Sequence, residues 1–328
     1  MEPTPIPTPA ELEQVFFPWP ARGRATDGHP MARIGIRLNL YFRRSGEPAM
    51  RRALVAITED YLRLAQGRIR HYAFADDNRA RSAKSGTEPD LTLLRQQAEG
   101  DGGFELEMSA APEGHANPWA MQFLATRPEA PAEKLGFLVA YLPFSAFEGA
   151  PRGSLRNLFH RWCNALAAEH AYAGYGFVLP SDIGGENAAV RRIGELAMRF
   201  VGLDVDSPGA TAIQCKEGIR CVNWLTAVSA RLLERMGGAA AVATAAGPAI
   251  QTRDYRAGTI FQAGETPQIG DADQQVAPGD YVALGRALKQ LRAPFPISIF
   301  DAPPGFRVPQ GADPDRAFAQ VWLARFDG

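Results

Sequence analysis

Hydrophobic and polar residues alternate most regularly at residues 33–42, where Ile34, Ile36, Leu38 and Leu40 occupy every second position. Successive side chains of a strand point to opposite faces of a sheet, so this period predicts a strand with one buried face. The pattern then changes to helical spacing over residues 50–64, behind a proline suited to a first helical turn. A strand followed by a helix indicates a layered α/β or α+β structure.

Short strands are predicted next, because apolar runs alternate with Gly, Pro and Asn at 69–74, 104–108, 119–126 and 135–142. Several strands without long helices between them favour antiparallel pairing. Helical patterns dominate afterwards, at 154–169, 188–200, 221–236, 281–291 and 315–326. Strand patterns remain at 175–179, 212–216, 250–255 and 259–262. The sequence therefore predicts an α+β fold of mostly antiparallel sheets packed with helices, with a more helical second half.

Three segments follow from these patterns. Residues 1–30 hold seven prolines and read as a tail that packs on the body, anchored by Phe16, Phe17 and Trp19. Residues 31–150 form an N-terminal α+β half and residues 151–328 a C-terminal α+β half. The weakest stretch, 143–153, divides them, and we expect the two halves to form one continuous unit.

Composition adds several exclusions. The chain has 328 residues, of which 46% are hydrophobic, and a formal charge of −1. That balance provides no excess of Lys and Arg to bind nucleic acid or an anionic membrane, so we expect neither partner. Three cysteines without a CxxC pair favour a reducing compartment. The N-terminus lacks the pattern of a signal peptide, and the expected location is the cytoplasm.

Catalytic signatures are weak. The five histidines show no metal-ligand spacing, and neither a GxSxG nor a phosphate-binding glycine loop occurs. Gly270-Asp271-Ala272-Asp273 resembles the start of a calcium loop but lacks the later glycine and glutamate. No cofactor or metal is predicted. The alternative enzyme hypothesis is a metal-dependent hydrolase that uses Asp271, Asp273 and Glu265.

Four strings in the C-terminal half occur together in a recognisable order. They are Gly218-Ile219-Arg220-Cys221-Val222-Asn223-Trp224-Leu225-Thr226, the glycine pair at 237–238, Phe261 to Asp271 (FQAGETPQIGD), and Trp322 to Gly328 (WLARFDG). With the opening strand and the Tyr172-Ala173-Gly174-Tyr175-Gly176 segment, they resemble the type VI secretion immunity family that protects against nuclease effectors. The resemblance covers about residues 31–328. The chain departs from it at Cys221, where a smaller residue is expected, and in the proline-rich start.

The resemblance implies a non-enzymatic, cytoplasmic antidote that binds the nuclease toxin of its own cell and protects producer and sister cells. A nuclease presents a basic cleft to DNA, so a carboxylate-rich inhibitor surface can steer association and block access. The acidic segment from Glu265 to Asp280, within a stretch (257–285) that has no basic residue, is the first candidate. The partner-binding candidates are Glu265, Asp271, Asp273, Asp280, Asp204, Asp206, Asp182, Glu186, Glu105 and Glu107.

The recurring Gly and Trp positions also have a structural interpretation, which we favour: glycines permit turns, Trp224 fills core and Asn223 caps a helix. A third hypothesis is a structural or regulatory partner of the secretion apparatus. The identity of the nuclease, the mode of inhibition and the oligomeric state stay open.

Overall fold

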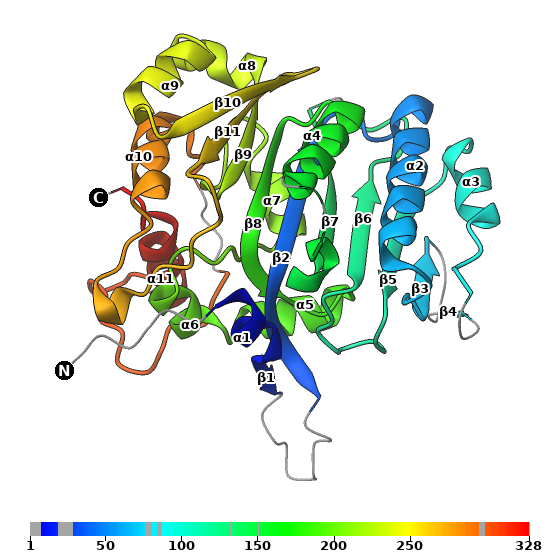
Figure 1. The fold of residues 1–328 in the computed structure, drawn as a ribbon, viewed down its shortest axis with the longest axis horizontal. Helices are drawn as coiled ribbons and strands as arrows, with labels where there is room; N and C mark the ends of the chain where they lie inside the picture. The colour runs from blue at the N-terminus through cyan, green and yellow to red at the C-terminus, as the bar shows by residue number, and fades with distance from the viewer. Residues whose placement is uncertain are drawn as a thin grey trace.

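The computed structural model describes residues 8–18, 29–75, 81–83, 87–131, 133–149, 151, 153–294 and 299–327, and gives the backbone alone at residues 9, 10, 16 and 183. Within these residues, helices pack on a large antiparallel sheet, and most of the helices follow residue 150 (Figure 1). The predicted α+β class is confirmed.

The strands of the described chain are β1 (Phe16–Pro18), β2 (Pro30–Phe42), β3 (His71–Phe74), β4 (Arg81–Ser82), β5 (Phe104–Ser109), β6 (Ala120–Ala125), β7 (Gly136–Leu142), β8 (His170–Val178), β9 (Leu225–Ser229), β10 (Ile250–Tyr255) and β11 (Gly258–Ala263). They form one sheet with the order β10-β11-β9-β8-β2-β7-β6-β5-β3-β4, and β1 pairs with β2 outside this path. All the pairings between these strands are antiparallel.

The central strand β2 lies between β7 and β8. Its alternating apolar side chains, from Ile36 to Phe42, enter the largest apolar core, as the period of two predicts. The intervening residues Arg37, Asn39 and Tyr41 are also fully buried, although the sequence indicated one buried face. The difference arises because helices cover both faces of this part of the sheet.

The helices of the described chain are α1 (Pro9–Gln14), α2 (Pro48–Ala65), α3 (Thr92–Ala98), α4 (Ser154–Leu166), α5 (Ile183–Val190), α6 (Gly194–Arg199), α7 (Pro208–Gln214), α8 (Ala230–Leu233), α9 (Ala239–Ala246), α10 (Gly279–Ala287) and α11 (Pro314–Leu323), with 3₁₀ turns η1 (Phe144–Phe147), η2 (Glu234–Met236), η3 (Ala272–Gln274) and η4 (Lys289–Leu291). None of the helices in these residues combines the length and apolar character that crossing a bilayer requires.

The helices divide between the two faces of the sheet. On one face, α2 and α4 pack over β2 and its neighbours, and α3 packs beside α2 (Figure 1). On the other face, α5 contacts β2 and α7 contacts β7. The helix α2 begins with Pro48 and ends where Gln66 adopts the left-handed conformation. The elements α8, α9 and α10 pack at the end of the sheet formed by β9, β10 and β11.

Three predictions of secondary structure are wrong. Residues 221–236 were predicted as one helix, but they contain β9 followed by the short α8. The strand β9 is buried on both faces, so it lacks an alternating pattern that would distinguish it from a buried helix. The predicted strand 212–216 lies largely in α7, which starts at Pro208. The predicted helix 188–200 is divided into α5 and α6.

The N-terminal residues that the structure describes lie against the body. The helix α1 buries Leu12, and β1 pairs with the start of β2. The Phe17 ring lies 6.2 Å from the Phe177 ring, whereas Trp19 lies outside the described residues. The sheet also crosses the proposed boundary near residue 150, because β2 pairs with β8 from Arg33↔Val178 to Tyr41↔His170.

Candidate partner-binding residues and a buried ionic cluster

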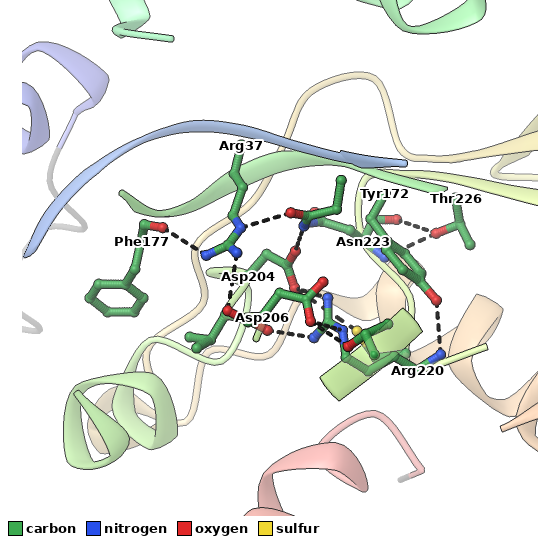
Figure 2. Close-up of polar contacts among 12 residues, drawn as sticks. Arg37, Tyr172, Phe177, Asp204, Asp206, Arg220, Asn223 and Thr226 are labelled. Carbon is green, nitrogen blue, oxygen red and sulfur yellow. Dashed lines mark hydrogen bonds and ion pairs between the residues drawn. The ribbon is translucent and has the colours of Figure 1, made fainter. Parts of the chain in front are cut away.

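The polar face of β2 starts a buried network of charges (Figure 2). The Arg37 guanidinium donates through Nε to Asn39 Oδ1 at 3.0 Å, through Nη1 to the Phe177 carbonyl at 3.1 Å, and through Nη2 to the Asp206 carbonyl at 3.1 Å. Asn39 Nδ2 donates in turn to Asp204 Oδ2 at 2.7 Å. Each of these donors is satisfied inside the protein, as burial of a polar group requires.

The segment between α6 and α7 supplies the carboxylates because it runs beside β8. The amide of Phe177 donates to the Asp204 carbonyl, and the amide of Asp204 donates to the Tyr175 carbonyl, each at 2.9 Å. A side chain at Gly176 would bring its Cβ within 3.0 Å of the Asp204 carbonyl oxygen. The glycine therefore permits the close approach that inserts Asp204 and Asp206 under the sheet.

Arg220 joins the two carboxylates from the other side. Its Nη2 lies 2.7 Å from Asp204 Oδ1 and its Nε lies 3.3 Å from Asp206 Oδ1. Asp206 also accepts hydrogen bonds from the hydroxyls of Tyr41 and Thr211. Burial, together with Asp206, raises the pKa of Tyr41 well above its usual range, so its hydroxyl stays protonated and donates.

One carboxylate of this network is poorly matched. The guanidinium groups of Arg37 and Arg220 lie near three carboxyl groups, those of Asp204, Asp206 and Glu186, so two cations are shared among three acids. Glu186 Oε1 lies 3.8 Å from Arg37 Nη2. Burial raises the pKa of Glu186 to about 8, although Arg37 opposes the shift. Glu186 is therefore the carboxyl group of this network that keeps its proton at neutral pH.

The strings behind the family resemblance support this network. Asn223 Oδ1 accepts from the Trp224 amide at 2.6 Å, and the Asn223 amide donates to Thr226 Oγ1 at 2.9 Å. A Cβ at Gly174 would lie 2.2 Å from Asn223 Oδ1. Trp224 is buried and donates to the Gly264 carbonyl. These residues hold the backbone and the core, in agreement with the structural interpretation, but Asn223 precedes a strand instead of capping a helix.

Four of the predicted partner-binding residues have roles within the fold. Asp204 and Asp206 are 1% and 0% exposed, so a partner cannot touch their side chains in the native structure. Asp182 caps α5 by accepting from the Gly185 amide at 2.6 Å, and it accepts from the Gly114 amide at 2.7 Å. Glu186 is 5% exposed. For Asp204 and Asp206, the prediction is replaced by a structural role, because sequence alone does not show burial.

Asp271 and Asp273 lie together but differ in exposure. Both contact Arg199, through its Nη2 and Nε respectively, at 3.2 Å. Asp271 is buried and caps η3, whereas the Asp273 side chain is 68% exposed. Burial acts to raise the pKa of Asp271, but the hydrogen bond and charge of Arg199, with hydrogen bonds from Gln274 and the Asp273 amide, together outweigh it and lower the pKa. Asp273 alone of this pair presents its carboxylate to solvent.

The remaining candidates lie at or near the surface. Glu265 is exposed after β11, and Asp280 is half-buried in the first turn of α10. Glu105 and Glu107 are half-buried on one side of β5, where Glu107 is opposite Gln122 of β6. Among the described residues, no group of three or more His, Cys, Asp or Glu side chains is arranged to hold a metal ion.

The residues that sequence reasoning missed are Arg37, Asn39 and Arg220. A weak signal existed in β2, where a charged and an amide side chain lie between the apolar residues of a long strand. Their partners are distant in the chain, since Asn39 and Asp204 are separated by 165 positions. A single sequence does not reveal such pairing.

Comparison with known proteins places this geometry in context. None of the curated proteins matches the chain. Among solved structures, it is similar to the Pseudomonas aeruginosa T6SS protein PA0821, with a TM-score of 0.75 and 22% identity, covering 92% of this chain and 83% of that one. At this level of identity the likeness shows a shared fold.

The family comparison identifies the class of protein. A family model described as type VI immunity for VRR-NUC matches residues 53–326, which is most of the chain. The protein is thus a type VI immunity protein. It belongs to the TsiV family, and the resemblance inferred from the C-terminal strings is confirmed.

Proposed function

We propose that this chain neutralises a VRR-NUC nuclease by binding it directly, without catalysing a reaction, in the cytoplasm of the cell that makes the toxin. The family match over residues 53–326 is the observation that carries the proposal. The three buried cysteines, none of them in a disulfide, are compatible with a reducing compartment.

Surface charge supports binding to a nuclease. A protein that holds DNA needs Lys and Arg side chains for phosphate contacts. Asp273 and Glu265 are exposed on the segment between β11 and α10, where the sequence has no basic residue from 257 to 285. An acidic surface of this kind accelerates encounter with a basic partner. The proposal includes this segment in the region that first meets the toxin.

Direct inhibition is tested with the full chain and the purified VRR-NUC nuclease domain of its cognate effector. Calorimetric titration should give a saturable complex, and nuclease activity on plasmid DNA should fall in proportion to the amount of complex. Cells that express the nuclease should survive when this chain is expressed with it.

Two outcomes would reject the proposal. The first is absence of binding together with unprotected cells. The second is turnover of a substrate by the immunity protein alone, which would revive an enzymatic function. Binding to components of the secretion apparatus instead of the nuclease would favour a regulatory role.

A further inference from the structure

A groove of about 500 Å³ lies between the sheet and the helices α5 and α7. Its walls include Leu124 of β6, Phe137 of β7 and Ile213 of α7. Leu124 is 41% exposed and Ile213 is 60% exposed, which is unusual for large aliphatic side chains. The groove therefore presents apolar surface to solvent in the native protein.

Two polar side chains lie deep in this groove. Glu186 is 5% exposed and Gln122 is 2% exposed. Gln122 faces Glu186 and acts to lower its pKa, but among the described residues neither Glu186 Oε1 nor Gln122 Nε2 makes a hydrogen bond of normal geometry. Buried polar atoms are normally hydrogen-bonded, so each such exception requires an explanation.

The charges around Glu186 leave it without a full counter-ion. Arg37 is the nearby cation, at 3.8 Å, but its guanidinium already donates to Asn39 and to two backbone carbonyls. Asp206 and Glu107 add negative charge at this position. On α5 itself, Arg191 also lines the groove, but its Nη1 lies 3.1 Å from Asp301 Oδ1.

We propose that this groove binds a Lys or Arg side chain of the partner nuclease, with the charged end paired to Glu186 and the methylene stem packed on Leu124 and Ile213. This inference rests on the proposed function and specifies a site at which the nuclease is bound. Lys and Arg stems pack well on apolar surface while their charged ends remain paired. The captured side chain supplies the counter-ion that Glu186 needs in order to ionise.

The choice of a cation over an apolar side chain follows from the cost of burial. An apolar group over Glu186 would remove the remaining contact with water from a carboxyl group that has no full counter-ion, which is unfavourable. A cation adds an ion pair in the same place. Nucleases hold phosphates with Lys and Arg, so this capture would also withdraw a positive side chain from DNA.

The test uses the full chain and the nuclease domain of its cognate effector. Three variants are compared with wild type: E186Q, which keeps the shape and removes the charge; I213D, at the exposed rim; and V321D, a control at an exposed aliphatic position on α11. We expect about tenfold weaker binding for E186Q and I213D, because each removes part of a desolvated contact. V321D should bind within about twofold of wild type.

A second measurement separates binding from folding. The wild-type complex should tighten as pH rises through 8, because a bound cation favours the ionised carboxyl, whereas E186Q should show a flat profile over this range. E186Q should also unfold at no lower temperature than wild type at pH 8.5. A purely structural role for Glu186 predicts loss of stability and no change in the pH profile.

The outcomes distinguish the two levels of the proposal. Wild type that binds, with E186Q equally tight, overturns cation capture. If I213D alone weakens binding, the groove accepts an apolar side chain instead, which also overturns it. Failure of wild type itself to bind rejects the proposed function, and the groove inference with it.

Discussion

The two faces of the central sheet are built from different interactions. The face under α2 and α4 is apolar, with Leu38 and Leu40 packed against residues such as Leu54. The face under α5 and α7 buries Arg37, Asn39 and Tyr41 of the same strand. A single strand therefore supplies alternate residues to an apolar core and to an ionic cluster.

The two faces should differ in how they tolerate amino-acid substitutions. Apolar packing is non-directional, and its contribution scales with the area removed from water. The ionic cluster depends on particular partners, because each buried charge left alone carries a desolvation cost. The cluster also contains one carboxyl group more than it has guanidinium groups, and Glu186 is the one whose ionised form is least stabilised.

The largest effect is expected at Arg220. The R220A variant leaves Asp204 and Asp206 buried without their shared cation, and we expect it to lose about 3–5 kcal/mol in free energy of unfolding. Denaturant titration measures this loss. The control is R52A, which removes the exposed ion pair of Arg52 with Glu99 and should cost less than about 1 kcal/mol.

The apolar face should respond through cavity formation. The L54A variant truncates a fully buried side chain of α2, and a loss of about 2–4 kcal/mol is expected, insensitive to salt and to pH between 5 and 9. Denaturant titration at two salt concentrations checks the result. A strongly pH-dependent loss would contradict the assignment of this face to apolar packing.

Glu186 should give the ionic face a pH dependence of its own. Its pKa is about 8 in the folded protein against a usual value of 4.5, because it is buried. Unfolding releases its proton between these values, so this group lowers stability as pH rises from 4.5 to 8. The stability difference between E186Q and wild type should therefore grow over that range, by on the order of a few kcal/mol, and level off above pH 8.

The acid side provides an internal control for this measurement. Burial and the nearby Arg220 lower the pKa of His170 from 6.5 to about 3. The unfolded chain takes up this proton below pH 6.5, so His170 lowers stability as pH falls from 6.5 to 3. This loss of stability at acid pH should be the same in E186Q and wild type. If the free energies of unfolding of the two proteins differ by a constant amount at all pH values, Glu186 does not titrate as described.

Sequence reasoning succeeded where a local pattern has a unique meaning. The alternation in β2 and the helical pattern at 315–326 both predicted the observed elements, and Asp313 caps the latter helix, α11, by accepting from the Asp315 and Arg316 amides. It failed for β9, because a strand buried on both faces has no alternation to detect. Hydrophobic periodicity therefore identifies only those helices and strands that have one solvent-exposed face.

The candidate acids illustrate the same limit. Composition drew attention to acidic residues. Residue type alone does not distinguish a carboxylate that binds a partner from one that neutralises a buried arginine. Asp204 and Asp271 were therefore grouped with Asp273, although Asp204 and Asp271 are buried beside Arg220 and Arg199, whereas Asp273 contacts Arg199 from an exposed position. Only the three-dimensional arrangement separates Asp273 from the other two.

The smallest expected effect is on the rate of association. The double variant E265R/D273R reverses charge at two exposed positions of the acidic segment, and Asp271 stays intact because it caps η3. Exposed charges act mainly by steering encounter, so the association rate with the nuclease should fall about fivefold at low salt while dissociation changes little. The difference should disappear at high salt, because screening removes steering.

E129R, at another exposed position, serves as the control. Stopped-flow measurement at two ionic strengths tests this expectation. An unchanged association rate at low salt would show that this segment is not part of the encounter surface.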